Sequence, residues 1–453
     1  MVAWGPTSTS ICTWPSVPPC PPSRTSFVRF SRRTRRPERA AERKADVSGT
    51  SLADTPVGAA PIRQIHALTG VRILAALWVV LFHIRFSIAA EFPAVYAVFA
   101  PIITHGDYGV DLFFILSGYV ITLNYGRKMG GSLERKATVK FWWARLSRIW
   151  PAYFVMLAFV SVWHGSFLIF GATDPVAPRD FSVWSFLRQS TLVVQWTEAD
   201  FNRLTWNGAA WSVSVEALAY LLFPVLALLL FRLSRVLGSR GLGILAVLTV
   251  MPVVLFALAL GSLYAPWMWL IRILCEFVAG GLLFYALEKV QNRPGAQRIA
   301  NWLAPALIVA VLIVAYLLNG RVNERWGVLV VPALLVFVGA IVVGRKGLMS
   351  LLGHRWLVVG GMASYSVYLV HMPLIEIVWT AQERLPFLAQ GTLASKILIF
   401  LVPALATFFG FVLWKWVEEP ARRAMRRMSL QNIPERAVDD VPIKQAGIEA
   451  PRA

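Results

Sequence analysis

Cysteine and charge are both scarce in this chain of 453 residues. The three cysteines, Cys12, Cys20 and Cys275, have neither the number needed for a disulfide framework nor the spacing of metal ligands. Charged residues make up only 15% of the chain, whereas 57% of it is hydrophobic. A soluble domain of this length does not need so much apolar surface, so the composition indicates a membrane protein.

Internal repeats and a signal peptide are also missing. The lack of repeats disfavours transporters that are built from duplicated halves. Residues 1–62 are rich in Pro, Ser, Thr and Arg, and residues 428–453 are polar. We predict that both segments are disordered tails, or that the first is in part the product of a wrongly chosen start codon. The chemistry is therefore expected between them, in residues 63–427.

Ten apolar runs are each long enough to cross a bilayer core of roughly 30 Å. They lie near residues 72–88, 109–126, 150–171, 209–231, 242–262, 266–287, 303–319, 326–344, 356–379 and 395–417. We predict an all-α polytopic membrane protein with about ten transmembrane helices.

The formal charge of +20 would suit a nucleic-acid-binding protein, but its distribution follows membrane topology. Lys and Arg gather in alternate loops, at 127–148, 232–240, 289–298 and 345–355. Because positively charged loops are retained in the cytoplasm, both termini are predicted to be cytoplasmic. The partner that this distribution indicates is a lipid bilayer, and no nucleic-acid partner is expected. We expect the membrane to be a bacterial cytoplasmic membrane.

Ionisable side chains inside the apolar runs are the first candidates for function, because each costs roughly 2.5 to 3.5 kcal/mol to insert. They are His83, Asp111, Glu216, Arg272, Glu276 and His371. The predicted topology places His83, Asp111, Glu216 and His371 at similar depths, toward the outer half of the bilayer. We interpret them as the lining of a polar reaction chamber.

Plainer roles compete with catalysis at several of these positions. His83 could simply hydrogen-bond a neighbouring helix. Asp111 could cap its helix. Arg272 and Glu276 stand four residues apart on one helix face, so an ion pair between them is the favoured interpretation.

A second candidate site is cationic and lies at the predicted cytoplasmic surface. The stretch "KFWWARLSRIWP" places Arg145 and Arg148 three residues apart on one helical face, and Arg72 begins the first apolar run on the same side. Planar guanidinium groups suit phosphate oxygens. Ordinary anchoring of a membrane helix by positive charge is the alternative.

Several motifs together resemble the membrane-bound acyltransferase 3 family. In chain order they are "LTGVRILAALWVVLFHI", "YGVDLFFILSGYVIT", "FWWARLSRIWPAYF", "WNGAAWSVSVEALAYLLFP", "RILCEFVAGGLLF", "ASYSVYLVHMPLI" and "WVEEPARR". The resemblance implies transfer of an acyl group, often acetyl, from cytoplasmic acyl-coenzyme A to a hydroxyl group. The acceptors it implies are surface carbohydrates, glycolipids, peptidoglycan or macrolides.

The same resemblance assigns roles to residues. His83 is implied to be the catalytic histidine with Arg72 as its partner, and Arg145 and Arg148 are implied to bind the donor. Glu216 matches the acid of the fourth motif. We hypothesise that the donor thioester extends from the arginines along a channel to His83, which acts as general base.

Further roles follow from this hypothesis. Glu216 or Asp111 would orient the imidazole of His83, and His371 would contact the acceptor. No metal is expected, because the two intramembrane histidines lie on distant runs without a third ligand. An exporter of a sugar or lipid is the alternative function, and a scaffold that has lost catalysis is a third.

Overall fold

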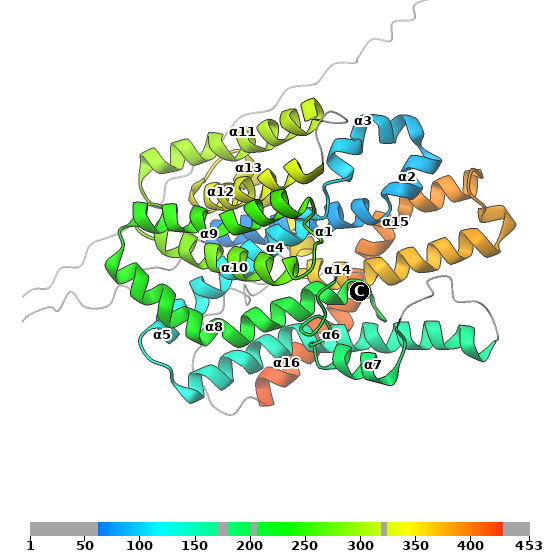
Figure 1. Cartoon of the computed structure of the whole chain (residues 1–453), viewed down its shortest axis with the longest axis horizontal. Coiled ribbons are helices and arrows are strands. Elements are labelled where there is room, and N and C mark those ends of the chain that lie inside the picture. The colour runs from blue at the N-terminus through cyan, green and yellow to red at the C-terminus, as the bar shows by residue number, and fades with distance from the viewer. Residues whose placement is uncertain (1–61, 171–179, 201–205, 319–323, 429–453) are drawn as a thin grey trace, which may run out of the picture. The chain divides into compact units, whose positions relative to one another are not determined.

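The computed structural model describes residues 62–170, 180–200, 206–318 and 324–428. Within these ranges the chain is helical and has no strand (Figure 1). Ten helical segments are long and apolar enough to cross a membrane, which confirms the predicted all-α architecture. The predicted tails lie outside the described residues, apart from Ile62, where the first helix begins, and Met428, where the last one ends.

The ten spans are built on ten long helices. These are α1 (Ile62–His83), α4 (Tyr108–Ile121), α6 (Arg135–Ile169), α8 (Ala210–Val236), α9 (Ser239–Leu260), α10 (Met268–Leu287), α11 (Pro294–Leu318), α12 (Val330–Val343), α14 (Arg355–Arg384) and α15 (Leu393–Leu413). Short helices accompany them: α2 (Arg85–Glu91), α3 (Pro93–Ile103), α5 (Arg127–Gly130), α7 (Val183–Ser190), α13 (Leu348–Leu352) and α16 (Glu419–Met428). Two 3₁₀ turns are η2 (Glu324–Leu329) and η3 (Pro386–Leu388), and two π-helical turns are η1 (Thr122–Gly126) and η4 (Trp414–Glu418).

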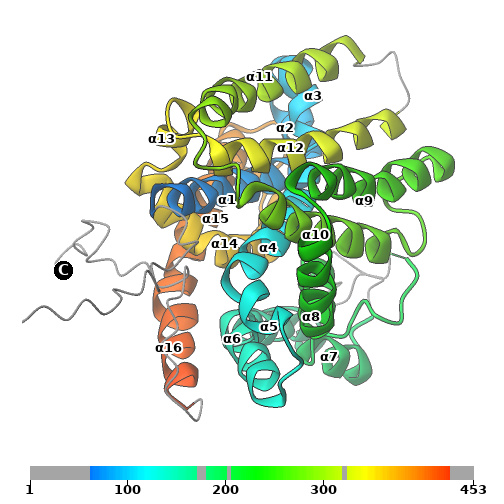
Figure 2. The ribbon, with the colours of Figure 1, turned by 90° about the vertical axis from the view of Figure 1, so that its left-hand side faces the viewer.

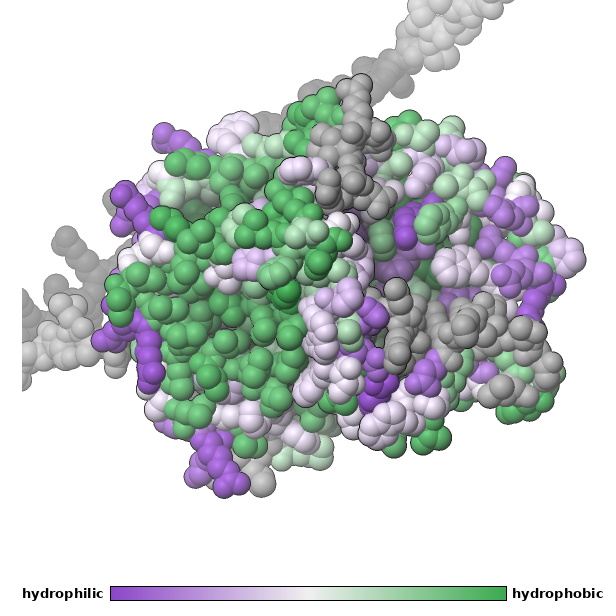
Figure 3. All heavy atoms as spheres, in the orientation of Figure 1, coloured by the Kyte–Doolittle hydropathy of each residue, from purple (hydrophilic) through white to green (hydrophobic). Residues whose placement is uncertain are grey.

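The long helices pack in two connected groups (Figures 1 and 2). α10 packs against α4, α8 and α9, and α14 packs against α1 and α15. α1 also contacts α4, which joins the groups. Apolar side chains cover the face over α8 and α9 in Figure 3, including the exposed Ile244, Leu248 and Leu255. Such a surface suits contact with lipid.

α6 is much longer than the third predicted run, which was expected to begin near residue 150. It begins at Arg135 and has 35 residues, or about 52 Å at the helical rise. It therefore exceeds the bilayer core, and the basic segment expected to be a loop forms its first turns. Tertiary contacts explain this extension, because Phe141 and Ala144 are buried and Trp143 Nε1 donates to the Met425 carbonyl of α16 at 2.8 Å.

Glycine brings α4 and α10 into close contact. A Cβ atom at Gly118 would lie 2.0 Å from the Phe277 carbonyl oxygen, and one at Gly280 would lie 2.2 Å from the Ile115 carbonyl oxygen. Small residues allow this approach, as is common between membrane helices.

A buried ion pair also joins these two helices. Arg272 of α10 donates from Nε and Nη2 to the Asp111 carboxylate at 2.9 and 2.8 Å, and both side chains are fully buried. The expected pairing of Arg272 with Glu276 is therefore wrong. The close approach of α4 offers Arg272 a carboxylate in the plane of its guanidinium, and two parallel hydrogen bonds are a stronger interaction than a contact along one helix.

We expect Arg272→Met to destabilise the protein by about 3–5 kcal/mol, because Asp111 would be left buried without its partner. The double variant Asp111→Leu with Arg272→Met should recover much of this loss. Thermal unfolding of the detergent-purified protein measures both. Arg127→Met is the control, since Arg127 is 49% exposed in its 2.6 Å pair with Glu288 and should cost less than about 1 kcal/mol. Equal losses for the two single variants would contradict the prediction.

Candidate functional site

A cavity of about 100 Å³ lies between α1, α4, α6, α8 and α14. Its polar lining residues are Arg72, Ser117, Arg145, Arg148, Ser212, Glu216, Tyr220, Tyr365 and Tyr368. We call it the arginine cavity. The three arginines singled out in the sequence share this cavity although they come from α1 and α6.

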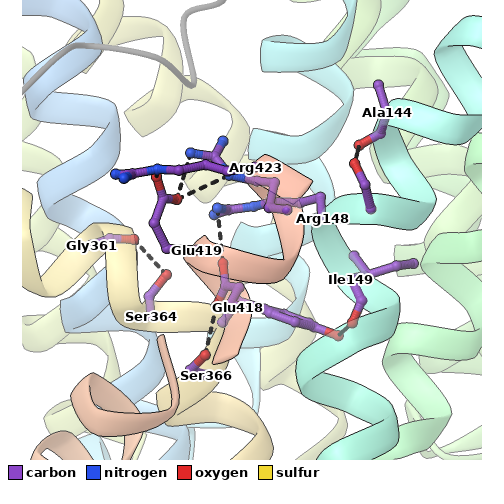
Figure 4. A network of polar contacts seen from close by, with 12 residues as sticks. Ala144, Arg148, Ile149, Gly361, Ser364, Ser366, Glu418, Glu419 and Arg423 are labelled. Atoms are coloured by element: carbon purple, nitrogen blue, oxygen red, sulfur yellow. Dashed lines mark hydrogen bonds and ion pairs between the residues drawn. The ribbon is translucent and has the colours of Figure 1, made fainter. Parts of the chain in front are cut away.

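Arg148 is held by a carboxylate that the sequence analysis did not select. Its Nη1 lies 2.9 Å from Oε1 of Glu418, and Oε2 of Glu418 accepts a hydrogen bond from Ser366 at 2.6 Å (Figure 4). Glu418 is fully buried at the end of the π-helical turn η4. It belongs to the "WVEEPARR" motif, so the sequence did carry a signal, but only the fold brings it to α6.

The next residue, Glu419, belongs to a separate network on α16. It accepts hydrogen bonds from Arg422 at 2.6 Å and Arg423 at 2.7 Å (Figure 4). Two adjacent glutamates therefore stabilise different arginines.

Aromatic rings hold the other two cavity arginines. Arg145 is buried, with its guanidinium carbon 5.4 Å from the Tyr125 ring centre and Nη2 3.4 Å from the Tyr125 hydroxyl. The guanidinium carbon of Arg72 lies 5.9 Å from the ring centre of Phe113. Such contacts stabilise a cation in an apolar surrounding and restrict its rotamers.

Glu216 lies in the arginine cavity and its partners are hydroxyl groups. It accepts a hydrogen bond from Ser117 at 2.7 Å and another from Tyr220 at 2.6 Å. Asp111 is bound to Arg272, as described above. The structure thus places neither carboxylate on His83, contrary to the expected orienting role.

His83 and His371 lie against each other, although they come from α1 and α14. Their ring centres are 4.9 Å apart. Nδ1 of His83 lies 2.9 Å from the Val79 carbonyl, and Nδ1 of His371 contacts the Tyr368 carbonyl. Because a carbonyl only accepts, each Nδ1 is the donor, and Nε2 of a neutral ring then carries the basic lone pair. Backbone carbonyls therefore orient both rings.

One aromatic side chain stands between this histidine pair and the arginine cavity. Tyr368 lines the cavity, whereas its ring centre lies 5.1 Å from that of His371. His83 is not part of the cavity lining. Tyr368 thus connects the cavity lining to His371, and the expected channel from the arginines to His83 stays a prediction.

A metal centre is not formed by the part of the chain that the structure describes. No group of three or more His, Cys, Asp or Glu side chains in that part could hold a metal ion. The polar groups at hand are guanidinium, carboxylate, hydroxyl and imidazole, which suit anion binding and proton transfer.

The chain is similar in sequence to known acyltransferases. Residues 65–417 match the family described as "Acyltransferase domain". Acyltransferase MdmB of Streptomyces mycarofaciens is 29% identical over 400 residues, covering 84% of this chain and 97% of the relative. O-acetyltransferase OatA of Staphylococcus aureus is 24% identical over 384 residues, which are 80% of this chain and 58% of the relative.

A third relative matches over a shorter stretch. Peptidoglycan O-acetyltransferase OatA of Listeria monocytogenes is 28% identical over 177 residues, which are 38% of this chain and 25% of the relative. No solved structure matches the chain. Because the family match spans most of the sequence and all of the helices that line the site, the chain belongs to this acyltransferase family.

Proposed function

We propose that this protein is an integral-membrane O-acyltransferase that moves an acyl group, most simply acetyl, from acyl-coenzyme A to a hydroxyl group. The observation that carries the proposal is the arginine cavity beside the His83–His371 pair. The cavity supplies cations for an anionic donor, and the pair supplies a base.

The arginine cavity supports a coenzyme A donor through its chemistry. Arg72, Arg145 and Arg148 offer guanidinium groups that match phosphate oxygens. We place the acyl group and part of the thioester arm inside this cavity of about 100 Å³, and the nucleotide at its mouth.

His83 is the base in the reaction we propose. Its Nε2 takes the proton of the acceptor hydroxyl as the oxygen attacks the thioester carbon. A C–O bond forms, the C–S bond breaks, and the coenzyme A thiolate leaves. The imidazolium returns the proton to that thiolate, which gives neutral His83 and free coenzyme A. In this proposal His371 supports the ring of His83 and contacts the acceptor.

The acceptor we propose is a carbohydrate, glycolipid or macrolide-type molecule. The names of the relatives include a peptidoglycan O-acetyltransferase, which supports a polymeric sugar as one such acceptor. We place the protein in a bacterial cytoplasmic membrane with both termini in the cytoplasm, on the strength of the charge in alternate loops.

An exporter of a sugar or lipid remains the competing function from the sequence analysis. It needs no coenzyme A, so binding of acetyl-coenzyme A to the purified protein separates the two. Failure to bind this donor, in protein that is folded by size-exclusion chromatography, would favour the exporter.

Replacing His83 by Ala should lower acyl transfer by about 10²–10⁴-fold, because a positioned general base contributes that much. The assay follows radiolabelled acetyl-coenzyme A in membranes supplied with peptidoglycan fragments, lipid-linked sugars and macrolides. His354→Gln is the control, since His354 is exposed before α14 and should leave transfer unchanged. Full activity of His83→Ala would remove His83 from the mechanism.

Replacing Arg145 or Arg148 by Ala should weaken binding of acetyl-coenzyme A by about 10- to 100-fold, which is the range expected for a lost hydrogen bond to a charged group. Calorimetry or equilibrium dialysis with purified protein measures this affinity. Arg355→Ala serves as the control, because Arg355 is exposed and lies over the ring of Trp356. Unchanged affinity in both cavity variants would place the donor elsewhere.

Glu418→Gln should raise the KM for the donor about tenfold with a smaller effect on kcat, because Arg148 would lose the carboxylate that holds it. Glu419→Gln is a matched control at the neighbouring position, where the partners are Arg422 and Arg423. The prediction fails if both variants change KM equally, or if Glu418→Gln alters only kcat.

A further inference from the structure

One aromatic ring of the cavity lining, that of Tyr368, contacts the histidine pair, and together with the Phe113 ring it forms a wall of the arginine cavity. Tyr368 and Phe113 both line the cavity, and their ring centres are 6.2 Å apart. On its other side Tyr368 meets His371, which in turn meets His83. Tyr368 therefore connects the lining of the arginine cavity to the histidine pair.

Contacts from three helices hold Tyr368 in this place. Its hydroxyl shares a hydrogen bond of 2.7 Å with Ser212 of α8. Its ring packs against Phe113 of α4 and against His371, one turn further along its own helix α14. The side chain is buried. Displacing a ring that is held in this way costs free energy, because packed interiors have little spare volume.

Phe113 also connects this wall to the donor site. The guanidinium carbon of Arg72 lies 5.9 Å from the ring centre of Phe113. Phe113 therefore contacts both a cation of the cavity and the Tyr368 ring. The wall is therefore part of the cavity itself and not a distant feature of the bundle.

We propose that Tyr368 limits the size of the acyl group that can pass from the arginine cavity to His83. This inference rests on the proposed acyl transfer and adds a selectivity residue to it. The carbon next to the thioester carbonyl is a methyl group in an acetyl donor. In an isobutyryl donor the same carbon carries two methyl groups and is therefore branched. The branch demands room that the Tyr368 ring occupies, and overfilling a packed site is unfavourable.

The test compares kcat/KM for acetyl-coenzyme A and isobutyryl-coenzyme A in wild type, Tyr368→Ala and Tyr368→Phe, with an acceptor found in the panel above. Tyr368→Ala should shift the preference toward isobutyryl at least tenfold, because the ring is removed. Tyr368→Phe keeps the ring and should retain the wild-type preference.

A neighbouring tyrosine provides a matched control. Tyr365 also lines the cavity, but its hydroxyl donates to the Ile149 carbonyl at 2.8 Å. Unlike Tyr368, its ring does not stack on either ring of the histidine pair. Tyr365→Ala enlarges the same cavity away from the wall. It should therefore leave the ratio between the two donors within about twofold of wild type, whatever it does to the rate.

An unchanged donor preference in active Tyr368→Ala would overturn the inference while leaving the proposed acyl transfer intact. An equal shift in Tyr365→Ala would overturn it too, because cavity volume alone would then explain the result. If Tyr368→Ala does not fold, the ratio of the kcat/KM values for the two donors is measured in Tyr368→Val and Tyr368→Leu and interpreted in the same way. If wild type transfers no acyl group from either donor to any acceptor, the proposed function fails and this inference falls with it.

Discussion

A charge buried in an apolar helix bundle needs a partner, and this requirement organises the interior of the protein. Asp111 and Arg272 satisfy each other between α4 and α10, and Arg148 is satisfied by Glu418. Each pair joins helices that are far apart in the sequence. Removal of one partner would leave the other charge buried and unpaired, so both contacts constrain how these helices pack.

The two pairs serve different parts of the molecule. Asp111 and Arg272 cross-link two helices at a place where glycine has already brought their backbones together, so the pair is part of the frame. Arg148 lines the arginine cavity, and Glu418 pairs with it. There the carboxylate of Glu418 holds the guanidinium of Arg148 beside the space that we assign to the donor. This pair therefore serves the binding site.

In the path that we propose, the groups that bind the donor and the groups that act as base lie at different places. The guanidinium groups collect on one side of Tyr368, and the imidazoles of His83 and His371 lie on the other. On this path the acyl group must pass the Tyr368 ring before it reacts, so the same residue controls both access and selectivity.

The sequence by itself determined the ten spans, the all-α class and the family, because apolar length and seven ordered motifs are local properties of the chain. It also singled out His83 and His371, because an ionisable group in an apolar run is costly, and Arg72, Arg145 and Arg148, because they cluster where such runs begin. Only the tertiary structure decided which of these meet. Partner choice depends on helix neighbours and backbone distance, so Arg272 pairs with Asp111, Glu418 reaches Arg148, and Tyr368 lies between the arginines and the histidines.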